Sequence, residues 1–92
     1  MVDVYLQMVN KIIRQQQVIV GPLALEQAKK VSGLIIDKPH EIKLIKDGKA
    51  VVTDLIDEYA NLFGKASIEV CRDAVREINP PVPADMLPSI LK

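Results

Sequence analysis

The chain has 92 residues, with 12 basic and 12 acidic side chains and a hydrophobic fraction of 49%. This length suits one small domain with a single core. Zero net charge removes the long-range field that attracts proteins to nucleic acids or anionic membranes, which argues against both as partners. Only Tyr5, Tyr59 and Phe63 are aromatic, so we expect a core of aliphatic side chains, which suits close packing between helices.

Cysteine content and the N-terminal sequence indicate the cellular compartment in which the protein resides. Cys71 is the single cysteine, so the chain has no intramolecular disulfide. Asp3 stands where an export signal would carry positive charge, and no apolar run approaches the roughly 18 residues of a membrane span. We therefore expect a soluble, cytoplasmic protein with no membrane association.

Residues 2–17 carry the first clear pattern. Their apolar side chains recur at steps of three and four residues, which places them on one face of a helix. Val4 and Met8 lie beside this stripe and widen it. The pattern predicts a first helix with a broader apolar face than a single packing contact requires.

A short second helix is expected over residues 22–32. The three β-branched residues Val18, Ile19 and Val20 favour an extended segment before it, and Gly21-Pro22 is a strong break. Pro22 suits the first position of a helix, and Gly33 suits its C-terminal cap.

The next stretch, residues 34–47, predicts a minor β segment. Residues 34–36 are apolar, residues 37–40 read as a turn, and residues 41–46 partly alternate. Asp47-Gly48 allows two interpretations. It is a good hairpin signal, with residues 50–52 as the return strand, but a helix starting near Lys49 competes with it. We favour the helix.

Two further helices complete the predicted domain. The first runs from about residue 50 to residue 63, where Gly64 ends it. Its apolar residues match the helical stripe at every expected step; they are Val52, Leu55, Ile56, Tyr59, Leu62 and Phe63. The second runs from about residue 66 to residue 78. It carries Glu69–Arg72 and Asp73–Arg76 at spacings of three, which favour ion pairs along the helix.

The end of the chain, residues 80–92, differs in kind. Its four prolines forbid a long helix, yet its aliphatic residues are too numerous for an ordinary disordered tail. We therefore predict a mainly α fold, with about four short helices in a compact bundle and a minor β segment at 34–47. Residues 1–79 form the helical domain, and residues 80–92 form a Pro-rich apolar tail that lies against a surface.

Chemistry-bearing side chains are few and scattered. His40 and Cys71 occur once each, about thirty residues apart, and the histidine falls in a predicted turn. Cys71 falls on an apolar helix face, where an unpaired cysteine usually acts as a small hydrophobe. No metal-ligand spacing, phosphate loop or dinucleotide motif is present. We expect no catalytic residues, no cofactor and no metal.

The surplus of apolar helix surface suggests association. We expect a non-catalytic interaction or oligomerisation module, such as an adaptor, regulatory subunit or small scaffold. A homodimer is the commonest arrangement, and a protein partner could also bind the tail. The candidate interface residues are Val2, Tyr5, Leu6, Val9, Ile12, Ile13, Met86, Leu87, Ile90 and Leu91.

The alternative function is a small DNA-binding transcriptional regulator. Its candidate contact is a weak basic patch in the 38–49 stretch, made of Lys38, Lys43, Lys46 and Lys49. Glu41 and Asp47 interrupt this patch, and such mixed charge usually marks a solvated face. Binding that weakens steeply as salt rises would favour this alternative.

Overall fold

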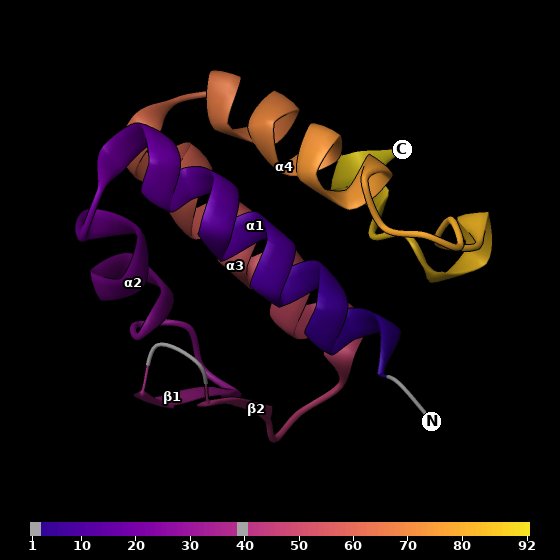
Figure 1. Cartoon of the computed structure of the whole chain (residues 1–92), viewed down its shortest axis with the longest axis horizontal. Helices are drawn as coiled ribbons and strands as arrows, with labels where there is room; N and C mark the ends of the chain where they lie inside the picture. Colours follow the sequence, from indigo (N-terminus) through magenta and orange to yellow (C-terminus); the bar gives the residue numbers. More distant parts are fainter. Residues whose placement is uncertain (1–2, 39–40) are drawn as a thin grey trace.

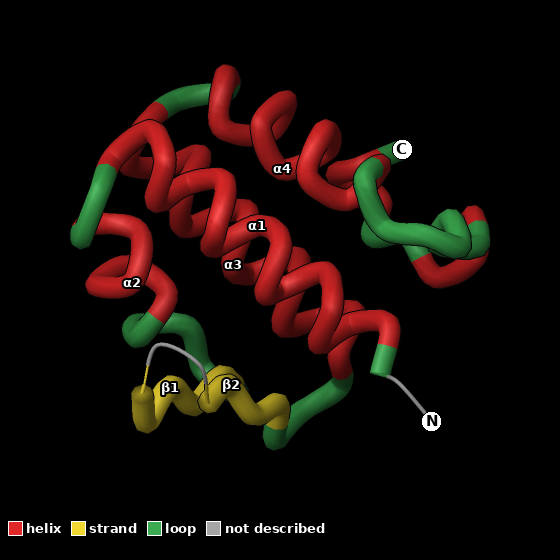
Figure 2. Tube along the Cα trace, in the orientation of Figure 1, coloured by secondary structure: helices red, strands yellow, loops and turns green. Residues whose placement is uncertain are grey.

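The computed structural model describes residues 3–38 and 41–92, except for the side chain of Lys38. Four helices surround one core, and a two-stranded sheet closes one side, so the predicted mainly α fold with a minor β segment is confirmed (Figures 1 and 2). Helix α1 lies over α3, with α4 along one side of this pair and α2 with the sheet along the other.

Helix α1 spans Val4–Val20 and is longer than predicted. Asp3 caps its start by accepting hydrogen bonds from the backbone N–H groups of Tyr5 and Leu6, at 2.9 and 3.3 Å. The prediction that residues 18–20 are extended is wrong. Each residue added to an existing helix gains a hydrogen bond, and this outweighs the small helix penalty of β-branched side chains. Gly21 ends α1 with a φ of 66°, a conformation that suits glycine.

Helix α2 is a shorter element, Leu23–Ala28, and not the predicted helix over 22–32. Pro22 stands at its N-cap position. Gly33, with a φ of 89°, turns the chain toward the sheet. A side chain at Gly33 would lie 2.9 Å from carbon atoms of Lys46, so this turn also needs a glycine for space.

Strands β1 (Leu34–Lys38) and β2 (Glu41–Leu44) form an antiparallel hairpin. Leu34 pairs with Leu44, and Ile36 pairs with Ile42. The predicted turn at residues 37–40 falls partly outside the described residues, and His40 lies outside them. Asp47-Gly48 is not a hairpin turn: the carboxylate of Asp47 accepts a hydrogen bond from the backbone N–H of Ala50, at 3.1 Å, and caps α3.

Helices α3 (Gly48–Phe63) and α4 (Ala66–Arg76) agree closely with their predicted positions. The start of α3 lies beside the start of α1, since Gly48 packs against the ring of Tyr5. The helices bury one aliphatic core. Its fully covered side chains include Met8, Val9 and Ile12 from α1, Leu55, Ile56 and Tyr59 from α3, and Cys71 and Ala74 from α4.

The Pro-rich tail lies against the helical domain. It forms two short 3₁₀ turns, η1 (Ala84–Met86) and η2 (Ser89–Leu91), and η2 contacts both α3 and α4. Pro88 is buried and Leu91 belongs to the core cluster. The amino group of Lys49 donates a hydrogen bond to the carbonyl oxygen of Asp85, at 2.8 Å, and fixes the tail to the start of α3.

Candidate functional site

The structure buries the centre of the predicted interface within the single chain. Val9 and Ile12 are completely covered, and Ile13 and Leu91 are only 3% and 5% exposed. The partly buried members of the set pack around this core; they are Tyr5, Leu6, Leu87 and Ile90. Met86 lies half-buried in η1, and Val2 lies outside the described residues. The broad apolar face of α1 therefore packs against the chain's own helices.

Exposed aliphatic side chains gather instead where α1 ends and α2 begins. Val18, Ile19 and Leu23 are 79%, 60% and 44% exposed. We call these three residues the apolar end. Helix α3 finishes at the same end of the molecule, with the 52% exposed Leu62 in its last turn (Figure 1).

Sequence reasoning missed the apolar end because it treated residues 18–20 as an extended linker. A helical signal was present, however. Val18 follows Lys11 and Arg14 by seven and four residues, which places it on the polar side of a continued helix. An aliphatic residue in that register is exposed unless another surface covers it.

A second feature is a cleft of about 640 Å³ beside the polar face of α1. Helix α1 supplies most of its lining, and β2 and the end of α4 supply the rest. Its lining residues are Gln7, Asn10, Lys11, Ile13, Arg14, Gln17, Ile42, Glu77, Ile78 and Asn79. Sequence reasoning did not find this cleft, because it joins segments more than sixty residues apart.

The candidate basic patch is divided by contacts within the chain. Lys46 donates a hydrogen bond to the hydroxyl of Ser32, at 2.5 Å, and Lys49 is bonded to the carbonyl of Asp85. Lys43 is exposed on β2, and the side chain of Lys38 lies outside the description. Two of the four amino groups thus have partners within the chain.

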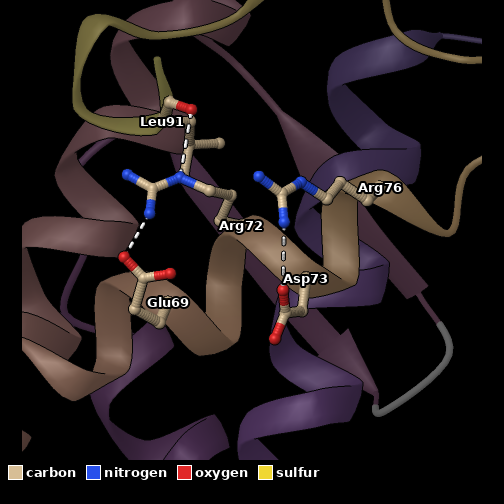
Figure 3. Close-up of polar contacts among 5 residues, drawn as sticks. All are labelled: Glu69, Arg72, Asp73, Arg76 and Leu91. Carbon is tan, nitrogen blue, oxygen red and sulfur yellow. Dashed lines mark hydrogen bonds and ion pairs between the residues drawn. The ribbon is translucent and has the colours of Figure 1, made fainter.

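Arginine side chains on α4 form both predicted ion pairs (Figure 3). Arg72 pairs with Glu69, and Arg76 pairs with Asp73 at 3.6 Å. The Nε of Arg72 also donates to the carbonyl oxygen of Leu91, at 3.4 Å, which joins α4 to the tail. Exposed ion pairs of this kind contribute little to the stability of the fold. The hydrogen bond from Arg72 to the backbone of Leu91 is therefore the contact that bears on how the tail is held.

Cys71 lies in a buried polar contact between α1 and α4. The amide of Gln16 donates to its sulfur at 3.6 Å and to the carbonyl oxygen of Ser67 at 3.4 Å. Burial raises the pKa of the Cys71 thiol to about 11, and the hydrogen bond from Gln16 offsets only part of this shift. The thiol is therefore protonated at neutral pH and is a poor nucleophile.

Within residues 3–38 and 41–92, no cluster of three or more His, Cys, Asp or Glu side chains could hold a metal ion. In the same part of the chain, no helix combines the length and apolar character needed to cross a bilayer.

Comparison of the chain with protein-family models, with curated proteins and with solved structures found no match.

Proposed function

We propose that this protein is a non-catalytic interaction module that pairs with a second copy of itself through the apolar end. The observation that carries the proposal is the exposure of Val18, Ile19 and Leu23, three large aliphatic residues within six positions. Water contact with such side chains is unfavourable, and covering them contributes roughly 25 cal/mol per Å².

The local shape supports a contact at this point. Gly21 and Pro22 join α1 to α2 at a sharp bend, so the apolar end lies at a corner of the backbone (Figure 1). The last turn of α3, which carries the exposed Leu62, finishes at the same end of the molecule. A twofold contact would place each corner against the same corner of the partner.

Electrostatics permit self-association as well. The chain has no net charge, so two copies do not repel each other at long range. The three residues of the apolar end are themselves uncharged, so covering them buries no ionic group of their own. We place this association in a reducing compartment such as the cytoplasm, because the chain has one cysteine and therefore no intramolecular disulfide.

Two matched variants test the proposal. Ile19 and Ile45 are exposed to almost the same extent, 60% and 62%, but Ile45 lies between β2 and α3, outside the apolar end. In sedimentation experiments at micromolar to millimolar concentrations, we expect wild type and Ile45→Asp to approach twice the 10.2 kDa of one chain. Ile19→Asp should remain a single chain, because pairing would bury its new carboxylate.

Circular dichroism must show that both variants keep the helical content of wild type. A wild-type mass of one chain throughout the concentration range would refute the proposed pairing. Equal pairing by folded Ile19→Asp and Ile45→Asp would refute its location at the apolar end.

A further inference from the structure

The backbone of the tail, residues 80–92, bonds to itself and not to the backbone of the helices. Its hydrogen bonds include those from the N–H of Met86 to the carbonyl oxygen of Pro83, at 3.0 Å, and from the N–H of Leu91 to that of Pro88, at 2.9 Å. In the part of the chain that the structure describes, no backbone hydrogen bond joins the tail to a helix. Detaching the tail therefore leaves the hydrogen bonds of the helices intact.

Two side chains of the helices make the polar contacts that hold the tail. Lys49, in the first turn of α3, donates to the carbonyl oxygen of Asp85 at 2.8 Å. Arg72 on α4 donates to the carbonyl oxygen of Leu91 at 3.4 Å, which is long for a hydrogen bond (Figure 3). The first contact is exposed and the second is only partly buried. Water can replace such bonds at a small net cost in free energy.

Apolar contacts of the tail are concentrated near its end. Pro88 is buried, Leu91 is 5% exposed, and the turn η2 that contains Leu91 contacts both α3 and α4. Leu87 and Ile90 are partly buried beside them. Residues 87–91 therefore form the anchor of the tail.

The segment that connects this anchor to α4 is exposed. Asn79, Pro80, Pro81 and Pro83 all face solvent. The prolines carry no N–H group. Within residues 3–38 and 41–92, no hydrogen bond joins segment 79–83 to a helix. This segment therefore links the domain and the anchor without being bonded to the helices itself.

A cavity of about 270 Å³ separates part of the tail from α4. Val82 and Leu87 line it on the tail side, and Val75 and Arg76 line it on the helix side. Protein interiors are normally packed with few voids larger than a water molecule. The tail thus packs closely at its anchor and loosely between the anchor and the end of α4.

We propose that the tail is a releasable strap. It opens as a unit about residues 79–83 while the helices stay folded, and it controls access to the aliphatic surface of α3 and α4 that Pro88 and Leu91 cover. The anchor favours the closed state, and the conformational freedom of the released segment favours the open state. A unit held by so few contacts opens at a lower cost in free energy than the whole fold. The strap lies away from the bend that carries the apolar end (Figure 1).

Native-state hydrogen exchange, measured by NMR on the full chain, tests the proposal. The amides of Met86, Leu87 and Leu91 report on the tail, and those of Leu55 and Ile56 report on α3. Isolated 3₁₀ turns do not persist, so opening exposes the tail amides. We expect the tail amides to be protected about 10- to 1,000-fold relative to an unfolded chain, and the α3 amides at least about tenfold more. Urea should accelerate exchange in α3 more steeply, because its effect scales with the surface exposed.

Two pairs of variants test the contacts that close the strap. Leu91→Ala removes an anchor and should accelerate exchange in the tail at least about tenfold, whereas Ser89→Ala, at an exposed position of the same turn, should not. Lys49→Met removes the donor to Asp85 and should accelerate exchange about threefold to tenfold. Lys43→Met makes the same change of charge on β2 and should behave as wild type does. Lys49→Met also provides a second variant if Leu91→Ala impairs folding.

Three results would overturn the proposal. Tail amides that exchange as slowly as those of α3, with the same response to urea, would show that the tail opens only when the whole chain unfolds. Tail amides without protection would show that the strap is never closed. Unchanged tail exchange in folded Leu91→Ala and Lys49→Met would show that these contacts do not close it. Ile19→Asp should keep wild-type exchange in the tail, so failure of the strap and failure of self-association are distinguishable.

Discussion

The hydroxyl group of Tyr59 donates a hydrogen bond to the backbone carbonyl oxygen of Ala24, at 2.7 Å, within the core. Tyr59 is completely buried in α3, and Ala24 is buried at the start of α2. This bond fixes the short helix α2, and with it Leu23 of the apolar end, against the body of the molecule. The burial that surrounds it raises the pKa of the Tyr59 hydroxyl above its ordinary value.

Replacing this hydroxyl should reduce stability. We expect Tyr59→Phe to lower the free energy of unfolding by about 1–2 kcal/mol, because the Ala24 carbonyl loses its partner in a buried position. Urea unfolding followed by circular dichroism measures the change. Tyr5→Phe, at a partly exposed ring, is the control and should change stability less. Equal losses of stability from Tyr59→Phe and Tyr5→Phe would show that the hydrogen bond to Ala24 makes no specific contribution to the free energy of unfolding.

Gly48→Ala should destabilise the protein, although alanine is normally preferred over glycine in a helix. A Cβ atom at position 48 would lie 2.5–2.6 Å from carbon atoms of Tyr5, so the ring must move. We expect a loss of about 1–3 kcal/mol, typical of overpacking. The double variant Tyr5→Ala/Gly48→Ala removes the two ring carbons from this overlap and leaves the Cβ atom of residue 5, so it should relieve part of the cost. If Gly48→Ala costs as much in the Tyr5→Ala background as in wild type, the predicted steric origin is wrong.

The last five residues should be required for full stability. Pro88 and Leu91 are buried on the helices, so a chain that ends at Leu87 loses an apolar cover over α3 and α4. Burying one large aliphatic side chain contributes roughly 1.5–3 kcal/mol, and we expect a loss of at least this size. Removal of the exposed Lys92 alone is the control. A truncated chain with an unchanged melting temperature would contradict the observed packing of the tail.

Alkaline pH should weaken the fold partly through Cys71. Its pKa rises from 9.0 to about 11 in the folded state, chiefly through burial. The protonated thiol is therefore favoured by folding. The associated stability is fully present below pH 9 and is lost as the pH rises through about 11, with a total on the order of 2–3 kcal/mol.

The comparison with Cys71→Ala isolates this contribution. Tyr59 also has a raised pKa, but the larger cause is its burial, which Cys71→Ala retains, and the charge of Cys71 is the smaller cause. The stability difference between wild type and Cys71→Ala should therefore shrink between pH 9 and pH 11, as measured by urea unfolding at each pH. A constant difference across this interval would contradict the proposed burial effect.

Hydrophobic periodicity located the helices well where burial in the core determines the structure. In α3, the first four members of the predicted stripe, Val52, Leu55, Ile56 and Tyr59, are completely covered. Its last two members are not, since Leu62 is 52% exposed and Phe63 is partly buried. The same reasoning recognised the apolar face of α1 but attributed its width to a second chain. In the structure α2, α3 and α4 all contact α1, so three neighbouring helices cover that face. A sequence pattern shows that a helix face is apolar, but it does not show how many neighbouring elements cover it.

Local signals were less informative at the ends of elements. Residues 18–20 have β-branched side chains, yet the helix continues through them to Gly21. The apolar end was missed for this reason. The cleft was missed for another reason. Glu77 and Asn79 line the same cleft as Lys11 and Arg14 only because α4 packs beside α1. This long-range packing has no local sequence signature.

The most direct test of self-association through the apolar end is an isotope-filtered NMR experiment on a mixture of ¹³C-labelled and unlabelled chains. The account predicts intermolecular nuclear Overhauser effects from the methyl groups of Val18, Ile19 and Leu23 to the partner chain. Intermolecular contacts confined to other surfaces, or none at millimolar concentration, would contradict it.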